Sequence, residues 1–202
     1  MKLRLRLKEH FRENRIQYCV VAALFILGII IGAFKAGDLE SPVRERLLAM
    51  IDAYVGDQGG VYGLTVFISA LITQGRYILA IWALGLTVIG IPIILAVIFM
   101  RGFSLGFTTS FLFKEKAAQG VLLSLISLLP QNLIYIPILL VLSVLAVNFS
   151  LYVVRGRSYR KASLGVSLLG YTSVVGALSL VFILGAFVEA YLVPWLVDIF
   201  IK

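Results

Sequence analysis

The feature that most constrains this chain is a stretch of 38 residues, 117 to 154, that contains no charged side chain. An apolar stretch of this kind indicates a membrane-spanning segment. It is too long for one crossing, because a helix rises about 1.5 Å per residue and the hydrocarbon layer is roughly 30 Å thick. We therefore expect a break near Pro130, which divides residues 117 to 129 from a span over 133 to 154. The amides of Gln131 and Asn132 can satisfy the backbone groups that a proline leaves unpaired.

The rest of the chain is similarly apolar. It is 61% hydrophobic and 14% charged, whereas soluble domains are about 45–50% apolar and about 25% charged. Further uncharged runs cover residues 16 to 34, 77 to 100, 102 to 113 and the segment from 162 to 187. We expect an all-α polytopic membrane protein, one domain over residues 1 to 202, with about five transmembrane helices and with broken or short helices around residues 90 to 132.

Charge sets the expected orientation. With the N-terminus, Arg101 and residues 155 to 161 on the cytoplasmic side, that side holds eleven Lys or Arg and two acids, against seven and eight outside. This positive-inside bias predicts five crossings, with the N-terminus cytoplasmic and the C-terminus outside. The third crossing, 102 to 113, is short for a span. Either it belongs to a longer tilted helix from which Lys114 and Lys116 reach outward, or residues 102 to 129 form a re-entrant hairpin. The hairpin puts the basic 155 to 161 loop on the wrong side.

Two polar segments flank the first span. Residues 1 to 15 form a basic arm that suits the cytoplasmic membrane surface. Residues 35 to 76 read as an extracytoplasmic loop, in which Ser41 and Pro42 start an amphipathic helix. The apolar stretch from 61 to 73 is shorter than a span, so we expect an elbow helix there.

The sequence contains few residues of the types that catalyse reactions or bind metals. His10 is the only histidine and Cys19 the only cysteine, and no cluster has metal-ligand spacing. No nucleotide-binding glycine motif is present either. We expect a protein that is not an enzyme and that uses no cofactor or metal. Its net charge of +8 is explained by membrane topology, so no nucleic acid partner is expected.

Several residues within the apolar runs need an explanation. Burying the carboxylate of Glu189 within the membrane is energetically costly, so we expect it to pair with Arg76 at a matching depth. The alternative is that Glu189 lies at the level of the lipid headgroups and is half hydrated. The pair Gly28 and Gly32 form a G-x-x-x-G that lets another helix approach closely. The further candidates for a structural or partner-docking role are Gly90, Pro92, Arg101, Gly102, Pro130, Gln131, Asn132, Pro137 and Tyr191.

Three stretches carry a resemblance to a known family. They are RYILAIWALGLTVIGIPIILAVIFMRGFSLGF at 76 to 107, LISLLPQN at 125 to 132 and FVEAYLVP at 187 to 194. Each resembles the corresponding stretch of the stage II sporulation protein M family of endospore-forming bacteria. The resemblance implies a non-enzymatic scaffold in the mother-cell membrane that holds two peptidoglycan-degrading partners, stage II sporulation proteins D and P, at its outer face. Its contact elements would be residues 43 to 57, the turn at 114 to 116 and the tail from Glu189.

Two other functions stay open on the residues alone. A transporter of small molecules or lipids could use Gly90 to Pro92 and Pro130 to Pro137 as unwound gates, with Glu189 as coupling carboxylate. A homodimer or larger homo-oligomer could pair through Gly28 and Gly32. Either form would contact membrane lipid.

Overall fold

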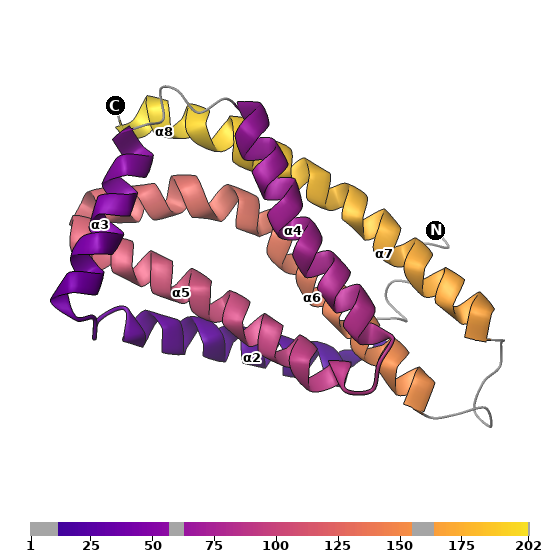
Figure 1. The fold of residues 1–202 in the computed structure, drawn as a ribbon. Coiled ribbons are helices and arrows are strands. Elements are labelled where there is room, and N and C mark those ends of the chain that lie inside the picture. The colour runs from indigo at the N-terminus through magenta and orange to yellow at the C-terminus, as the bar shows by residue number, and fades with distance from the viewer. Residues whose placement is uncertain (1–11, 57–62, 155–163, 202) are drawn as a thin grey trace.

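The computed structural model describes residues 12–56, 63–154 and 164–201, and these are helical almost throughout (Figure 1). Five helical segments are long and apolar enough to cross a membrane, which confirms the predicted all-α, multi-pass fold. The elements are α2 (Arg15–Lys35), α3 (Ser41–Gly56), α4 (Gly63–Gly85), α5 (Gly90–Leu123), the π-helix η2 (Ser124–Leu128), α6 (Leu129–Val154), α7 (Leu164–Phe187), the π-helix η4 (Val188–Leu192) and α8 (Val193–Ile201).

The five spans are Arg15–Lys35, Gly63–Gly85, Gly90–Ala117, Gly120–Val154 and Leu164–Val197. They define two ends of the bundle. The Arg15 end holds the start of α2 and the 86–89 turn, and hydrogen bonds from Asn148 to Asn14 and from Ser150 to Thr87 place the end of α6 there. The α3 end holds α3 and the last turn of α2, which ends at Lys35, at the left of Figure 1.

Helices α2 and α5 lie parallel and closely packed, because small residues alternate across their contact. Gly28 and Gly32 on α2 are matched by a second G-x-x-x-G, Gly102 and Gly106, on α5. A Cβ at any of the four would collide with backbone of the other helix. Glycine interfaces of this kind let helix backbones approach closely. The contacts are Gly28 with Phe99 and Phe103, Gly32 with Phe103 and Phe107, Gly102 with Phe25, and Gly106 with Ile29.

The spans differ from the expected segments between residues 61 and 113. The structure has one continuous helix over Gly63–Gly85, so residues 63 to 73 are the first half of a span and not an elbow. The uncharged run from 77 to 100 is not one span either, because it contains the 86–89 turn and the start of α5. The short segment from 102 to 113 lies within the longer span Gly90–Ala117, which removes the reason for a re-entrant hairpin. The physical cause is that Arg76 and Arg101 sit within helices and do not end them.

The next break lies before Pro130. The backbone of Ala117 has a φ of 48°, and there α5 kinks. The helix then continues through η2 and Pro130 into α6, with Pro137 inside α6. A π-turn beside a proline accommodates the lost backbone hydrogen bond without ending the helix. Asn132 donates from Nδ2 to the carbonyl oxygen of Leu128 at 2.8 Å, one turn earlier on the same helix.

Packing is uneven along the bundle. In the half nearer the Arg15 end, buried side chains from α4, α5, α6 and α7 form one core, in which Tyr135 stacks on Phe182 and Tyr171 stacks on Phe149. In the other half, the segment from η2 into α6 stands apart from α5 (Figure 1). Cavities occupy this second half, and the candidate site lies where the two halves meet.

Candidate functional site

Arg101 lies at mid-depth of the bundle. Its neighbour Gly102 touches the carbonyl of Phe25, which is the middle residue of the 21-residue helix α2. The expectation that Arg101 closes a span on the cytoplasmic side is therefore wrong. An arginine at such a depth is costly, and charged groups within spans normally face the bundle interior or an aqueous cavity.

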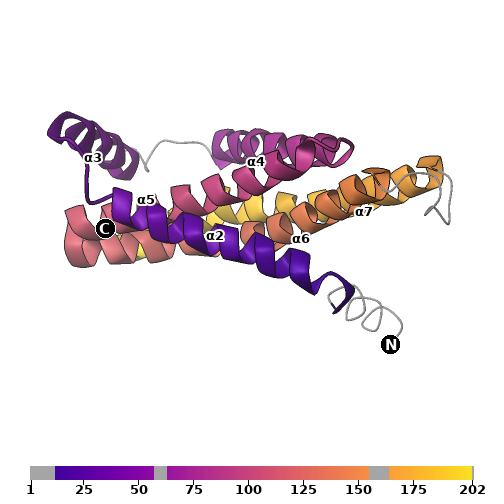
Figure 2. The ribbon, with the colours of Figure 1, turned by 90° about the horizontal axis from the view of Figure 1, so that it is seen from below.

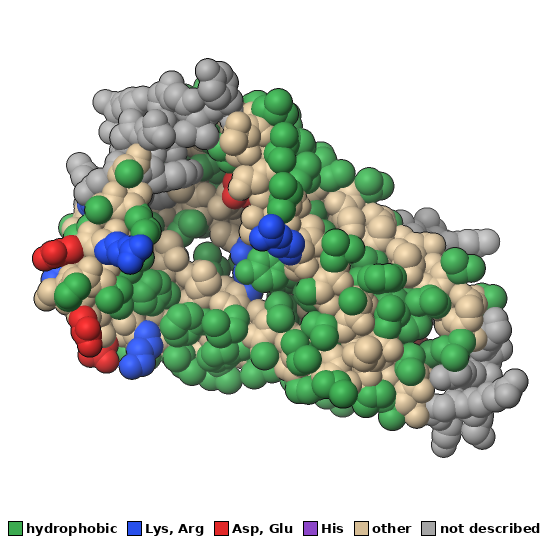
Figure 3. Space-filling model, in the orientation of Figure 1, with side chains coloured by type: hydrophobic (Ala, Val, Ile, Leu, Met, Phe, Trp, Pro, Cys, Tyr) green, Lys and Arg blue, Asp and Glu red, His purple; other side chains and the backbone are tan. Residues whose placement is uncertain are grey.

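Arg101 lines a polar cavity of about 180 Å³. Four elements contribute to it: α4, α5, the η2–α6 segment and η4. Figure 3 shows a hollow in this face of the molecule, with Lys and Arg side chains beside it. The lining residues are Thr73, Gln74, Arg101, Ser104, Leu105, Thr108, Leu128, Gln131, Asn132 and Glu189.

The two charges in this cavity are each held by an aromatic residue. The guanidinium carbon of Arg101 lies 5.3 Å from the ring centre of Tyr77, in a cation–π contact. Glu189 accepts a hydrogen bond from the hydroxyl of Tyr135 at 2.9 Å. Within the described residues the salt bridges are Lys35–Asp38 and Arg44–Glu115, so Arg101 and Glu189 face the same cavity without a direct ion pair.

Arg76 is not the partner of Glu189. It is exposed on α4 and does not line the cavity, although it is close in sequence to Gln74. Gln74 is buried, with 6% of its surface exposed, and Gln131 also faces the cavity. Neither amide makes a side-chain hydrogen bond to another described residue.

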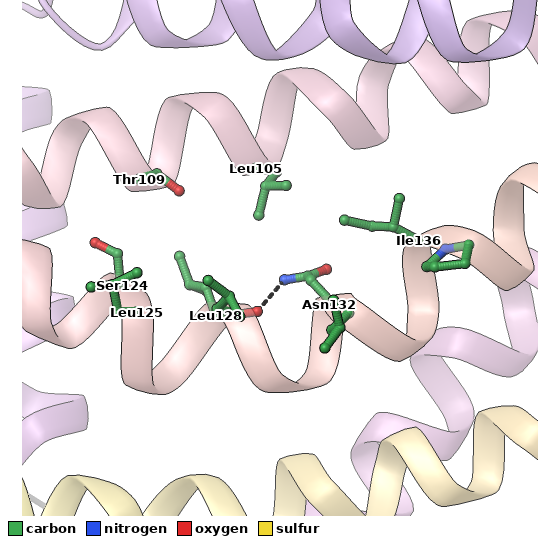
Figure 4. A pocket seen from close by; sticks show the side chains of 10 residues that line it. Leu105, Thr109, Ser124, Leu125, Leu128, Asn132 and Ile136 are labelled. Carbon is green, nitrogen blue, oxygen red and sulfur yellow. Dashed lines mark hydrogen bonds between the residues drawn. The ribbon is translucent and has the colours of Figure 1, made fainter. Parts of the chain in front are cut away.

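An apolar cavity of about 340 Å³ adjoins the polar one. Figure 4 shows side chains of α5 and of the η2–α6 segment converging on a gap between these helices. Leu105, Leu128 and Asn132 line both cavities, so the two are direct neighbours. The remaining lining residues of the apolar cavity are Thr109, Ser124, Leu125, Leu129, Leu133, Ile136 and Pro137.

At the α3 end, a salt bridge ties α3 to the bundle. Arg44 Nε lies 2.7 Å from Glu115 Oε1, whose side chain is only 11% exposed. The hydrogen bond and the negative charge of Glu115 raise the pKa of Arg44 above its ordinary value, so this cation stays charged at any physiological pH. Figure 2 shows α3 lying to one side of the other helices.

The remaining sequence candidates have local structural positions. Pro92 lies in the first turn of α5, where a proline is tolerated, and Gly90 packs against the carbonyl of Leu84. Tyr191 covers Gly63 at the start of α4. These residues shape the helix ends and do not line the polar cavity.

Sequence reasoning missed Tyr135, Gln74 and the polar stripe of α5. The signal for the stripe is present, because Arg101, Ser104 and Thr108 recur at helical spacing on one face. Tyr135 gives no such signal, since it is one aromatic residue within an apolar run. In the described part of the chain, no three His, Cys, Asp or Glu side chains lie close enough to hold a metal, and His10 falls outside that part.

Comparison with known proteins gives the family. No curated protein and no solved structure matches this chain. The family model described as Stage II sporulation protein M matches residues 21–194, which is most of the chain. The matched range includes all five spans in whole or in part, both glycine pairs and the polar cavity. This multi-pass membrane protein therefore belongs to the stage II sporulation protein M family.

Proposed function

We propose that this protein is a non-enzymatic scaffold of the engulfment machinery in sporulation. It localises peptidoglycan-degrading partners, stage II sporulation proteins D and P, at the outer face of the mother-cell membrane. Family membership supports the cellular process. The observation that carries the docking role is α3, a helix set apart from the bundle and tied to it by the Arg44–Glu115 bridge.

The orientation of this proposal rests on charge. The segments that adjoin the Arg15 end, residues 1–15 and 155–163, carry ten Lys or Arg and two acids. The segments of the α3 end, residues 35–57, 114–116 and 198–202, carry six Lys or Arg and seven acids. The bias survives the corrected helix boundaries, and it favours a cytoplasmic Arg15 end. On this orientation α3 lies outside, where cell-wall hydrolases act.

The docking surface consists of α3 together with the turn at Glu115. The two elements are joined by one salt bridge, so α3 has a defined position relative to the membrane although it packs little against the core. Val43 and Met50 on α3 are exposed apolar side chains, 47% and 55% accessible, of the type that a partner covers.

Charge reversal tests this docking surface in sporulating cells. Arg44→Glu should release α3 and disperse a fluorescent partner hydrolase from the engulfing membrane, with the scaffold itself still present at its normal level. Adding Glu115→Arg restores the bridge with reversed sign and should restore localisation. Arg46→Glu is the matched control, because Arg46 lies on the same helix outside this bridge. Localisation that is normal in Arg44→Glu, or lost equally in Arg46→Glu, contradicts the proposal.

The polar cavity favours a second candidate function, a transporter. Polar groups at mid-depth, between helices that π-turns and prolines distort, are typical of substrate pathways. Reconstituted protein would then support substrate flux that is lost in Glu189→Gln and kept in Arg76→Gln. Partner localisation that persists in Glu189→Gln, together with an absence of flux in the wild type, favours the scaffold.

A further inference from the structure

Two opposite charges share the polar cavity but do not pair with each other. Arg101 rests on Tyr77, and Glu189 is held by Tyr135. In a region of low dielectric, opposite charges attract strongly, and burying either one without a partner is costly. A group that lies between them and satisfies both charges would remove this cost.

We propose that the two adjoining cavities bind a zwitterionic amphiphile, with its head in the polar cavity and one acyl chain in the apolar cavity. The head carries an anionic oxygen group for Arg101 and an ammonium for Glu189, as in a phosphoethanolamine lipid. This inference does not depend on the scaffold role.

The chemistry of the polar cavity matches such a head. The guanidinium of Arg101 offers several N–H donors in one plane, which suits a phosphate. The carboxylate of Glu189 accepts hydrogen bonds from an ammonium, and one of its oxygens already accepts from Tyr135. The amides of Gln74 and Gln131, which make no side-chain hydrogen bond to described residues, can donate or accept at the same head. Buried amides normally have partners, so the amide of Gln74, which is unpaired within the described residues and 6% exposed, also points to a ligand.

The apolar cavity matches a chain. Its volume of about 340 Å³ lies within the roughly 300–1,000 Å³ of ordinary ligand pockets. Leucines dominate its walls, from Leu105 on α5 to Leu125, Leu128, Leu129 and Leu133 on the facing segment. Because bilayer lipid is as apolar as this wall, a chain gains little by leaving the bilayer for the cavity. Selectivity must therefore come from the head, and this makes the proposal specific.

Native mass spectrometry of the purified protein tests the head. The protein in detergent is mixed with equal amounts of palmitoyl-oleoyl phosphatidylethanolamine, phosphatidylglycerol and phosphatidylcholine. We expect retention of phosphatidylethanolamine over phosphatidylcholine by about tenfold, since the choline headgroup cannot donate a hydrogen bond to Glu189. Glu189→Gln should lower retention of phosphatidylethanolamine while leaving phosphatidylglycerol unchanged. Arg101→Gln should lower both, and Arg76→Gln, an arginine outside the cavity, should behave as wild type.

A second variant keeps the test valid if a charge variant fails to fold. Leu125→Trp fills the apolar cavity from a side chain that is 51% exposed, without touching either charge. It should reduce retention of every chain-bearing lipid, with an unchanged melting temperature. The proposal is overturned if the wild type retains none of the three lipids or does not distinguish their heads. It is also overturned if the cavity variants match Arg76→Gln. Cavity water alone would then accompany the two charges.

Discussion

The parallel contact of α2 with α5 predicts a strong difference between glycines. Replacing Gly28 by Ala places a methyl group against the carbonyl of Phe99 and 2.9 Å from the backbone nitrogen of Phe103. Backbone atoms of a helix cannot rotate away as a side chain can. The two helices must therefore move apart, and the contacts on both sides of Gly28 are weakened.

The magnitude follows from two terms of opposite sign. Overpacking in a close contact costs about 1–3 kcal/mol. Ala is favoured over Gly within a helix by roughly 0.8–1.0 kcal/mol. Gly28→Ala should therefore lower the free energy of unfolding by up to about 2 kcal/mol. Gly176→Ala on α7 meets nothing within 4 Å, so it keeps only the favourable term. The difference between the two variants isolates the overpacking, about 1–3 kcal/mol.

Thermal unfolding in detergent, followed by circular dichroism, measures this difference. One kcal/mol corresponds to about 2–4 °C for a chain of this size. We expect Gly176→Ala to melt at or above the wild-type temperature, and Gly28→Ala to melt several degrees below Gly176→Ala. Replacing both Gly28 and Gly32 by Ala should lower the melting temperature further. Equal melting temperatures for Gly28→Ala and Gly176→Ala would refute the close contact of α2 with α5.

Two further predictions concern buried hydroxyls. Ser150→Ala removes a 2.6 Å hydrogen bond to the carbonyl of Thr87, so it should lower the free energy of unfolding by about 0.5–1.5 kcal/mol. Ser143→Ala removes a buried hydroxyl that has no partner in the described residues, so it should leave the melting temperature unchanged or raise it. Equal losses for the two serines would contradict the hydrogen-bond assignment. Tyr135→Phe keeps its aromatic ring but leaves the Glu189 carboxylate without this donor, at a cost of about 1–3 kcal/mol that the same melting experiment detects; an unchanged melting temperature would show that the bond contributes nothing.

The number of crossings could be predicted from the sequence, but their boundaries could not. Hydropathy and the charge bias require five crossings, and the structure has five spans. The error came from reading Arg76 and Arg101 as span ends, because most charges in such chains do mark ends. The shortness of the segment from 102 to 113 was the available warning, since such a run must extend backward through Arg101 to cross the bilayer.

The site was only partly predictable for a similar reason. Glu189, Gln131 and Asn132 stood out as polar groups in apolar runs, and all three line the polar cavity. That Arg101 lies in the same cavity could not be predicted, because this depends on which helices lie side by side. The sequence contains two G-x-x-x-G motifs, at 28 to 32 and at 102 to 106, but nothing in it says that they face each other.

The turn at residues 86–89 gives the decisive experiment for this fold. In a Cys19→Ser background, a single cysteine at Val88, which is 52% exposed, is treated with a membrane-impermeant thiol reagent, and a cysteine at Arg46 on α3 serves as the external control. We predict labelling at position 46 in intact cells, and labelling at position 88 only after permeabilisation. Labelling of position 88 in intact cells would reverse the orientation. A position 88 that resists the reagent even after permeabilisation would place the turn inside the membrane and contradict the fold.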